Sequence, residues 1–381
     1  MQERTGDTTI VSVFRKYVNT RTNLLPYIYS ESIKSSATGS PMMRAMFLDF
    51  ADDANTYNLD QQYMFGHSLL VAPVMNEGET EKAVYLPEGE WIDFWHNALT
   101  AGGETKTYYA DVDSIPVYVK NGSIIPMNLN ANYELGGSIG NDVDNYTNLT
   151  FRVYPQGNSS YTVNNSDGTS MEIQATENFD QHKVTVQLPA YDSQITTQIF
   201  GSRPSSVTAN GNELQQVSSL DEFVAGTDCF FYNANEKFTY VKSSVKDAVA
   251  ICVNGISKAP FEAEHAALTG VSTNTNHTGY YGEGFVEQFA ENGDAVAFTV
   301  YEDAEAEKSV VIRYSAGTED AQRSISVNGE TVRISLPKTQ DWDTWSEISV
   351  PVHVVAGRNT INICYNEGDF AGINLDCIRI E

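Results

Sequence analysis

Three carboxylate side chains in the last third of the chain have the types and spacing of a metal site. Glu262 and Glu264 stand two residues apart, and Asp376 lies near the C-terminus. A spacing of two places both glutamates on one face of a strand. If the first and last strands of this region pair, the three carboxylates gather, and calcium prefers such all-oxygen ligands. The alternative interpretation is a pair of solvated surface glutamates.

The residues between these carboxylates have the spacing of a β-sandwich. Apolar and polar side chains alternate in the runs 296–300, 310–314, 325–327 and 332–336. A period of two over several short runs predicts antiparallel strands. Asn328-Gly329 separates two of the runs and residues 356–359 separate two more, as hairpin turns do. We therefore predict one jelly-roll-like sandwich of about 120 residues, a usual size for one domain.

Two long segments of this region resemble family 35 carbohydrate-binding modules, with family 6 next nearest. They read FEAEHAALTGVSTNTNHTGYYGEGFV and WDTWSEISVPVHVVAGRNTINICYNEGDFAGINLDCIRI. The resemblance covers roughly residues 259–381 and implies a structural calcium ion and a sugar site in loops at one end. It implies that the calcium ligands are Glu262, Glu264 and Asp376. The residues that it assigns to sugar binding are Tyr280, Tyr281, Trp342 and Asn374.

The side chains assigned to sugar binding also suit that chemistry by themselves. A sugar ring offers C–H faces and a rim of hydroxyls, so its binder needs flat aromatic surface and a planar amide or carboxylate. The alternative for Trp342 and Trp345 is that they only fill the sandwich, an interpretation that we favour for Trp345. For Tyr280 and Tyr281, binding and packing stay equally open.

Charge and composition exclude other classes of partner. The chain has 50 Asp and Glu against 23 Lys and Arg, a formal net charge of −27, which argues against nucleic acid and anionic membranes. We expect an extracellular or cell-surface location for the parent protein, although this chain carries no signal peptide and no apolar run that could span a bilayer. Among the four cysteines, Cys364 and Cys377 could pair, or they could be buried free thiols.

The first fifty residues have a different pattern. Apolar side chains recur at three- and four-residue steps from Ile10 to Tyr29 and predict a helix in which Pro26 starts a new turn or a kink. The uniformly apolar run Met42–Phe50 predicts a strand buried on both faces. A helix followed by such a strand is typical of an α/β architecture.

Five motifs between about residues 14 and 127 resemble the C-terminal stretch of glycoside hydrolase family 31, which contains α-glucosidases, α-xylosidases and transglycosylases. They are RKYVNTRTNLLPYIYSESIKSSATGSPMMRAMFLDFADD, YMFGHSLLVAPVM, VYLPEGEWIDFWHN and IPVYVKNGSIIPM in order, the first holding two motifs. The segment from Phe151 resembles the distal β domain of that family. We therefore predict a mainly β fold: the truncated end of a (β/α)8 barrel, two β-sandwich-type domains and a jelly-roll β-sandwich module. The predicted ranges are 1–74, 75–128, 129–245 and 258–381.

The resemblance implies a retaining mechanism with two carboxylates, but both family aspartates lie on barrel strands before the matched segment. We therefore assign no catalytic residue and expect this chain alone to be inactive. Asp49, Asp52 and Asp53 are interpreted as solvated turn formers or caps, and residues 1 to about 70 as marginally stable alone. The predicted activity is carbohydrate binding, with an oligo- or polysaccharide as partner. The alternatives are a glycosidase subunit completed by a separate barrel chain, and a non-enzymatic adhesion or scaffold protein.

Overall fold

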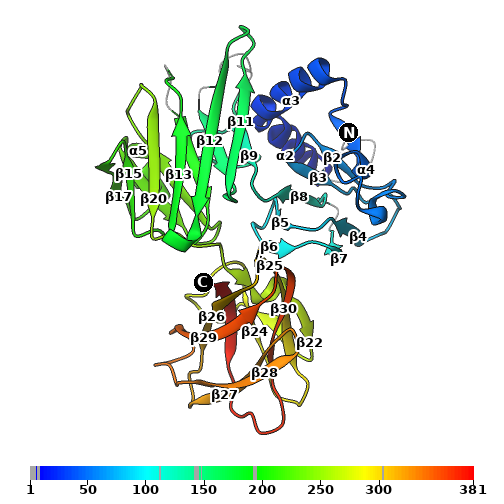
Figure 1. Ribbon diagram of the computed structural model, residues 1–381, viewed down its shortest axis with the longest axis vertical. Coiled ribbons are helices and arrows are strands. Elements are labelled where there is room, and N and C mark those ends of the chain that lie inside the picture. The colour runs from blue at the N-terminus through cyan, green and yellow to red at the C-terminus, as the bar shows by residue number, and fades with distance from the viewer. Residues whose placement is uncertain are drawn as a thin grey trace. The chain divides into compact units, whose positions relative to one another are not determined.

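The computed structural model describes residue 6 and residues 9–381, apart from residues 111–112, 141–145, 147, 192–194 and 303 and the side chain of residue 180. The fold is mainly β, as predicted, with several sheets and few helices. The chain divides into two compact units (Figure 1). Unit 1 contains residues 1–84, 107–233 and 237–257, and unit 2 contains residues 85–106, 234–236 and 258–381.

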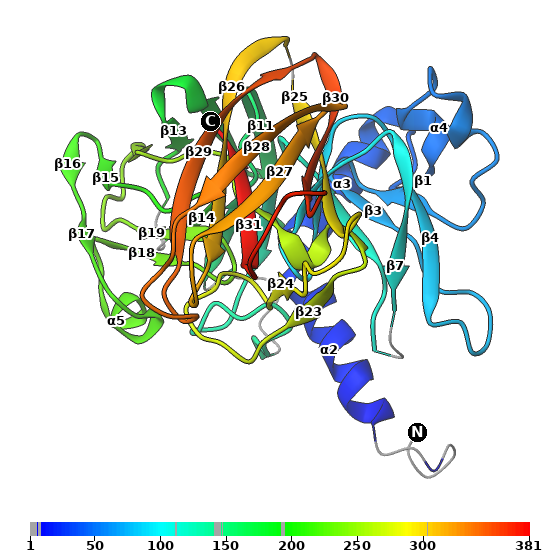
Figure 2. The same cartoon turned by 90° about the horizontal axis from the view of Figure 1, so that it is seen from below.

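Two helices open unit 1 where the apolar period predicted one broken helix. Helix α2 spans Ile10–Asn23 and helix α3 spans Leu25–Thr38. Pro26 lies in the first turn of α3, where its fixed φ suits a helix and its missing N–H is not needed. Gly39 ends α3 with a left-handed φ of 75°. Figure 2 shows the N-terminal half of α2 extending away from the sheets of this unit.

The predicted buried strand at Met42–Phe50 is wrong. The chain forms a three-residue strand β1 (Met43–Ala45) and then a short helix α4 (Met46–Asp49). The exposed fractions of Met43, Phe47 and Leu48 are 57%, 42% and 51%. An apolar run alone does not distinguish a buried strand from other structures. The turn into α4 is fixed instead by Arg44, whose Nη2 lies 2.6 Å from Asp49 Oδ2.

Three sheets lie in unit 1. The strands β1-β2-β3-β8 are neighbours in the first, β17-β18-β19-β14-β10-β9 in the second, and β11-β12-β13-β20-β15-β16 in the third. Their bounds are β2 (Tyr63–Phe65), β3 (Leu69–Val71), β8 (Val117–Lys120), β9 (Ile124–Asn128), β10 (Leu149–Val153), β11 (Asn158–Asn164), β12 (Ser170–Asn178), β13 (Lys183–Leu188), β14 (Ile195–Phe200), β15 (Ser206–Ala209), β16 (Asn212–Glu213), β17 (Gln215–Gln216), β18 (Cys229–Asn233), β19 (Phe238–Lys242) and β20 (Val249–Asn254). Tyr154, Phe200 and Phe238 form part of the core, with ring centroids 5.4 to 5.6 Å apart.

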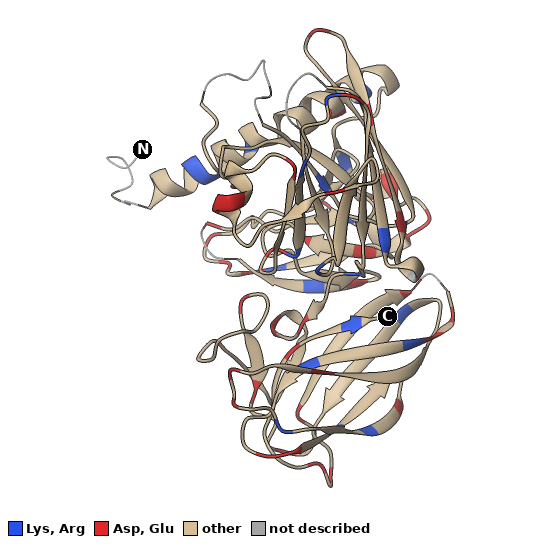
Figure 3. Cartoon of the chain, turned by 90° about the vertical axis from the view of Figure 1, so that its left-hand side faces the viewer, with Lys and Arg blue, Asp and Glu red and all other residues tan. Residues whose placement is uncertain are grey.

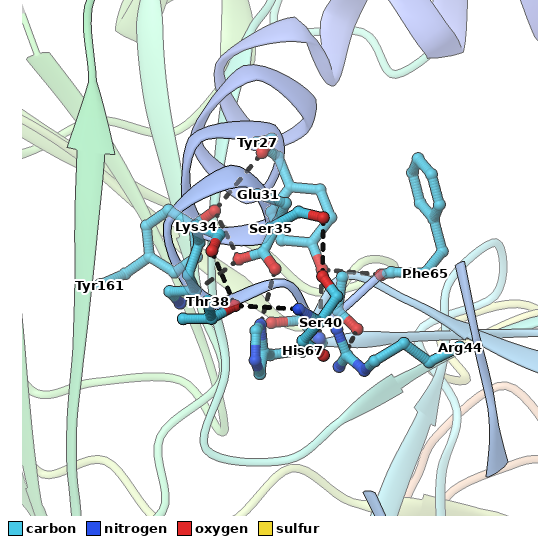
Figure 4. A network of polar contacts seen from close by, with 12 residues as sticks. Tyr27, Glu31, Lys34, Ser35, Thr38, Ser40, Arg44, Phe65, His67 and Tyr161 are labelled. Atoms are coloured by element: carbon cyan, nitrogen blue, oxygen red, sulfur yellow. Dashed lines mark hydrogen bonds and ion pairs between the residues drawn. The ribbon is translucent and has the colours of Figure 1, made fainter. Parts of the chain in front are cut away.

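Helix α3 is fixed within unit 1 by the buried carboxylate of Glu31 (Figure 4). Tyr161 Oη, from β11, donates to Glu31 Oε1 at 3.0 Å, and His67 Nδ1 lies 2.6 Å from Glu31 Oε2. Tyr27 Oη donates to the carbonyl oxygen of Phe65 at 2.8 Å. Burial, followed by the charge of Glu31, raises the pKa values of both tyrosines. These contacts favour a structural role for His67.

Unit 2 contains a β-sandwich of two antiparallel sheets, as the period-two runs predicted. One sheet has the order β23-β24-β31-β26-β29, with β21 also paired to β31, and the other has the order β22-β25-β30-β27-β28. The bounds are β21 (Phe261–Glu262), β22 (Ala267–Thr269), β23 (Ser272–Asn274), β24 (Phe285–Glu287), β25 (Ala295–Glu302), β26 (Ala306–Ser315), β27 (Ala321–Val327), β28 (Glu330–Leu336), β29 (Ser346–Val354), β30 (Gly357–Cys364) and β31 (Asn374–Ile380). Val296, Phe298 and Ile312 are at most 2% exposed and belong to its core.

The two predicted hairpins have different outcomes. Asn328 and Gly329 join β27 to β28 with φ values of 51° and 93°, as a tight hairpin of this type requires, so that prediction is confirmed. The segment 356–359 does not form a hairpin, because β29 and β30 belong to different sheets and residues 357–359 already lie in β30. Apolar alternation does not reveal which strands pair. A short link between two sheets therefore has the same sequence pattern as a hairpin.

A buried lysine holds a further hairpin within unit 2. Strands β5 (Glu90–Asp93) and β6 (Leu99–Ala101) pair with each other. Strands β4 (Glu81–Leu86) and β7 (Glu104–Tyr109) also pair, and residues 81–84 and 107–109 of these strands belong to unit 1. Lys258 Nζ lies 3.1 Å from Glu90 Oε1 and 3.4 Å from Glu302 Oε1. Burial opposes the charge of Lys258, but the two carboxylates outweigh it and raise its pKa.

The cysteines and the helices bear on two further expectations from the sequence. All four cysteines lie among the described residues and are free, with Cys364 on β30 and Cys377 on β31 in different sheets. The prediction of free thiols is therefore confirmed, but only Cys377 is buried, and Cys364 is half-buried. Among the described helices, none is both long and apolar enough to cross a bilayer. Figure 3 shows Asp and Glu distributed over strands and loops rather than gathered on one element.

Candidate carbohydrate-binding site

The first and last strands of the module pair and bring two acidic side chains together. Glu262 on β21 lies opposite Cys377 on β31. Glu262 is 3% exposed and Asp376 is fully buried. One ligand atom from each of Glu262, Asp376 and Cys377 lies within 4.8 Å of the other two. The pairing expected from the two ends of the module is therefore observed, and it forms an acidic cluster in the sheet.

Glu264 reaches the same region by a different route from the one expected. It lies in a 3-10 turn, Ala263–His265, so the prediction that it shares a strand face with Glu262 is wrong. Its Oε1 accepts hydrogen bonds from the backbone N–H groups of Glu283 and Gly284 at 3.0 and 3.1 Å. A Cβ at Gly282 would lie 2.7 Å from that oxygen and 3.1 Å from Glu262 Cδ. Glycine therefore lets this loop close over both carboxylates.

Asp376 has one positively charged neighbour. Arg313 Nε lies 3.0 Å from Asp376 Oδ2, and the backbone N–H of Tyr281 donates to Asp376 Oδ1 at 3.0 Å. Burial and then the charge of Glu262 raise the pKa of Asp376 well above its ordinary range, against the opposing effect of Arg313. Burial also raises the pKa of the Cys377 thiol, which makes it a poor ligand. The carboxylate oxygens fit a hard divalent cation, since one guanidinium does not balance three carboxylates.

The loop above the carboxylates carries the two predicted tyrosines. The ring of Tyr281 lies over the guanidinium of Arg313, with 4.0 Å between Arg313 Cζ and the ring centroid. Tyr280 packs at 5.6 Å from Phe285 and 6.5 Å from Trp345, measured between ring centroids. Both tyrosines are partly exposed, so each keeps surface that a ligand can contact. Arg313 occupies one face of Tyr281, which the sequence did not indicate.

The two tryptophans have different surroundings. Trp345 Nε1 donates to the carbonyl oxygen of Thr278 at 2.8 Å, and its ring lies 5.6 Å from that of Phe285, as expected of a packing residue. Trp342 lies against two glycines in the loops that follow β26 and precede β31. A Cβ at Gly317 would lie 2.7 Å from Trp342, and one at Gly372 would lie 3.7 Å from its Cη2. Trp342 therefore lies across the end of the β26–β31 pair.

Asn374 occupies that same strand end, together with a residue that the sequence did not single out. Asn374 lies opposite Ser315 in the last pair of the β26–β31 ladder. Both residues are buried, and neither Asn374 Nδ2 nor Ser315 Oγ has a hydrogen-bond partner among the described residues. Residues directly opposite in an antiparallel pair share a face, so the two polar groups are neighbours. Buried polar atoms normally have partners, and a bound hydroxyl would supply them.

A histidine beside Trp342 is a second residue that sequence reasoning missed. The rings of His277 and Trp342 lie 6.2 Å apart with an interplanar angle of 30°. His277 Nδ1 lies 3.4 Å from Asp343 Oδ1, which also accepts a hydrogen bond from the backbone N–H of Thr278 at 2.7 Å. These contacts tie the loop with the tyrosines to the loop with the tryptophans. Their sequence separation of 65 residues gave no local signal.

Comparisons with known proteins place both parts of the chain in families. Residues 39–125 match the model of the glycosyl hydrolase family 31 C-terminal domain, and residues 259–381 match that of the carbohydrate binding module, family 35. The chain is 49% identical to the isomaltosyltransferase of Sporosarcina globispora over 382 residues, which cover 100% of this chain and 35% of the relative. It thus spans about a third of the length of that relative.

Two solved structures from Listeria monocytogenes cover the whole chain. One is the cycloalternan-forming enzyme in complex with pentasaccharide substrate, with a TM-score of 0.97 and 45% identity, covering 100% of this chain and 36% of that chain. The other is described as an uncharacterized protein in complex with α-D-glucose, β-D-glucose, magnesium and calcium, with the same TM-score, identity and coverage. The chain therefore contains a glycosyl hydrolase family 31 C-terminal domain at residues 39–125 and a family 35 carbohydrate binding module at residues 259–381.

Proposed function

We propose that the chain binds oligosaccharides through residues 259–381, at the end of the β26–β31 pair near which Trp342 and Asn374 lie. The observation that most directly supports this proposal is the pair of buried polar atoms, Asn374 Nδ2 and Ser315 Oγ, at the end of the sheet where Trp342 lies. An aromatic ring supplies a face for the C–H groups of a sugar, while the amide and hydroxyl supply partners for its hydroxyls. Tyr280, Tyr281 and His277 line the neighbouring loop and complete the proposed site.

The proposed ligand is an α-linked glucose oligosaccharide. It is supported by the similarity of the chain to an isomaltosyltransferase and to a cycloalternan-forming enzyme bound to a pentasaccharide substrate. A neutral sugar also suits a chain with a net charge of −27, because it meets no electrostatic repulsion. Nucleic acid and anionic membranes remain unsuitable partners for the same reason.

The proposed cation is Ca²⁺, held by Glu262, Glu264 and Asp376. Its contribution would be charge neutralisation, since buried carboxylates are unfavourable unless they are compensated. Both the N–H of Tyr281 and those of Glu283 and Gly284 bond to these carboxylates, so a bound cation would also stabilise the loop that carries the tyrosines. The 45% identical structure that contains calcium supports this choice of ion.

For the whole protein we propose transfer or hydrolysis of α-glucosyl units outside the cell. The named relatives, an isomaltosyltransferase and a cycloalternan-forming enzyme, support this activity. The reacting carboxylates would come from barrel strands before the matched region, and this chain alone would be inactive. The module would hold the enzyme near its substrate and raise the local concentration of sugar ends.

Isothermal titration of the 381-residue chain with isomaltotriose and with glucose, in calcium and in chelator, tests the binding proposal. We expect saturable binding that Trp342→Ala weakens by more than about tenfold, or roughly 1.4 kcal/mol. The matched control is Trp345→Phe, which removes the bond to Thr278 but keeps an aromatic ring in the packing position. The absence of binding to either sugar, or equal binding by Trp342→Ala and the wild type, would contradict the proposal.

A second candidate function is that of a subunit completed by a separate barrel chain. Val11, Phe14 and Val18 form one exposed stripe on α2, with exposed fractions of 37%, 56% and 43%. Exposed apolar stripes of this kind mark contact surfaces. The test mixes the chain with a separately produced barrel segment of the S. globispora isomaltosyltransferase and follows activity on an aryl α-glucoside. Activity that Phe14→Ser reduces supports this candidate, and no activity in the mixture rejects it.

A further inference from the structure

The loop between β30 and β31, residues 365–373, is anchored by one buried arginine. Arg323 on β27 is fully buried. Its Nη1 donates to the carbonyl oxygen of Phe370 at 3.0 Å, and its Nη2 donates to that of Ala371 at 2.7 Å. The rings of Phe289 and Tyr365 lie 5.3 and 4.9 Å from Arg323 Cζ. A planar guanidinium between rings has little freedom to move, so these two carbonyl groups are fixed.

The residue beside Arg323 holds the other half of the same loop. Ser324 Oγ donates to Asp369 Oδ2 at 3.0 Å, and this carboxylate also accepts from the backbone N–H of Asn366 at 2.8 Å. Arg333 Nε, from β28, lies 3.1 Å from Asp369 Oδ1, and its Nη2 donates to the carbonyl oxygen of Glu367 at 2.6 Å. The loop is therefore held at four successive parts of its length by side chains of the β27–β28 hairpin.

This anchoring fixes a conformation that the loop sequence does not favour. Ala371 has a φ of 61°, a left-handed backbone that a residue with a Cβ rarely adopts. The bond from Arg323 to the carbonyl oxygen of Ala371 compensates for that conformation. Phe370 lies immediately before it and leaves 48% of its surface exposed, although its backbone carbonyl also accepts from the N–H of Gln322 at 3.1 Å. An exposed aromatic side chain thus stands on a rigid backbone.

The backbone of Phe370 lies next to the proposed sugar site. Gly372 would place a Cβ 3.7 Å from the ring of Trp342, and Phe370 is two residues before it. The Cα atoms of Phe370 and Gly372 are therefore separated by at most about 7.6 Å, because consecutive Cα atoms lie about 3.8 Å apart. That distance is comparable with the length of one sugar unit. A ligand on Trp342 that extends by one or two units can reach Phe370.

We propose that Phe370 contacts a second unit of the bound oligosaccharide and that Arg323 positions it through the loop backbone. The inference rests on the proposed carbohydrate binding at Trp342 and Asn374. It makes the module selective for chain length, because a single glucose can occupy the Trp342 position without reaching Phe370. A ring on a backbone that is already fixed loses little conformational freedom on binding, which favours affinity.

The first test titrates the whole chain carrying Phe370→Ala with isomaltotriose and with glucose. We expect binding of isomaltotriose to weaken by about fivefold, the usual effect of one aromatic contact, and binding of glucose to stay unchanged. The control is Tyr109→Ala, which removes a 76% exposed aromatic side chain from β7 in unit 1 and should change neither affinity. Equal weakening for both sugars, or wild-type affinity for isomaltotriose, would overturn the assignment of Phe370.

The second test examines positioning with variants of different severity. Arg323→Lys removes the paired bonds to Phe370 and Ala371 at a buried site. Arg333→Ala is the milder variant, because the side chain of Arg333 is 46% exposed. For a folded variant we expect weaker binding of isomaltotriose, unchanged binding of glucose and faster amide hydrogen exchange at residues 366–371. Faster exchange with unchanged binding of isomaltotriose would overturn the positioning role.

The outcomes separate this inference from the proposed function. If the wild type binds neither sugar, or if Trp342→Ala binds like the wild type, the carbohydrate site itself is wrong and the inference falls with it. If Trp342→Ala loses binding while Phe370→Ala keeps the full preference for isomaltotriose over glucose, only the second contact is wrong. A preference lost in Phe370→Ala, with glucose binding kept, supports both.

Discussion

The sandwich in unit 2 and the N-terminal segment of unit 1 differ in how far they bury similar apolar side chains. In the sandwich, Phe285 and Phe298 are at most 2% exposed, because two sheets cover each other. On α2, Phe14 and Val18 are 56% and 43% exposed, since only one side of this helix has a layer to pack against. The sandwich completes its own core, whereas the N-terminal segment leaves large apolar side chains exposed.

The largest expected effect tests this contrast directly with two truncations to alanine. Ile312 is fully buried in β26, so Ile312→Ala should remove about 3 kcal/mol from the free energy of unfolding of the sandwich. Phe14→Ala removes a larger side chain but should change stability by less than about 0.5 kcal/mol. Urea unfolding of the full chain, followed by fluorescence and circular dichroism, measures both. Similar losses for the two variants would mean that α2 has a packing partner.

The next effect concerns the proposed cation. Calcium at about a hundred times its dissociation constant should stabilise the sandwich by about 2.7 kcal/mol, which raises its melting temperature by roughly 10 °C. Calorimetry of the chain with calcium and with chelator should show this shift in the transition of the sandwich and no shift in that of unit 1.

The control for calcium is Glu262→Gln, which keeps the shape of a buried side chain but removes one charge from the cluster. The variant should melt at the same temperature in calcium and in chelator. A calcium effect that persists in this variant would place the ion elsewhere, and the same shift in both transitions would point to a nonspecific effect of salt.

The strands of the sandwich could be predicted from local patterns in the sequence. Alternation at Val296, Phe298 and Val300 gave the strands, since one face of each strand must be buried. Asn328-Gly329 gave a hairpin because both residues accept a positive φ. The same rules failed at Met42–Phe50, where apolar character without a period did not specify the structure, and at 356–359, where spacing did not specify the partner strand.

The candidate site was predicted only where it depends on residue types. The carboxylates Glu262 and Asp376 were placed together because the terminal strands pair. Ser315, by contrast, joins the site because of the register between β26 and β31, which no local pattern encodes. Arg323 likewise holds carbonyl groups 47 and 48 residues away. Contacts set by long-range register therefore explain most of what was missed.

A third prediction concerns the difference between the two helices of the N-terminal segment, α2 and α3. Helix α3 differs from α2 because Glu31 is buried against Tyr161 and His67. Glu31→Gln keeps the shape but weakens these bonds, and we expect it to lower the free energy of unfolding of unit 1 by about 2 kcal/mol. The control, Glu77→Gln, changes an exposed side chain and should have no measurable effect.

Hydrogen exchange provides a second measurement of the same division. The amides of α3 should exchange more slowly than those of the first two turns of α2, because α3 is anchored by buried contacts and the start of α2 is exposed. Glu31→Gln should reduce this difference. Uniform protection of both helices in the isolated chain would contradict the expected marginal stability of the N-terminal segment.

The smallest effect lies on the surface of the sandwich, at His353 on β29. Its Nδ1 lies 2.9 Å from Glu307 Oε1 and its Nε2 lies 3.2 Å from Glu305 Oε1. The bond to Glu307 and the two negative charges raise the pKa of His353 above its ordinary 6.5. The resulting stabilisation is fully present below pH 6.5 and is lost as the pH rises through the raised pKa of the folded state. Because the pair is exposed, the effect should be small and should shrink as salt is added. His353→Gln should remove this pH dependence from the transition of the sandwich, and a titration of the His353 ring by NMR that gave a pKa at or below 6.5 would contradict the assignment.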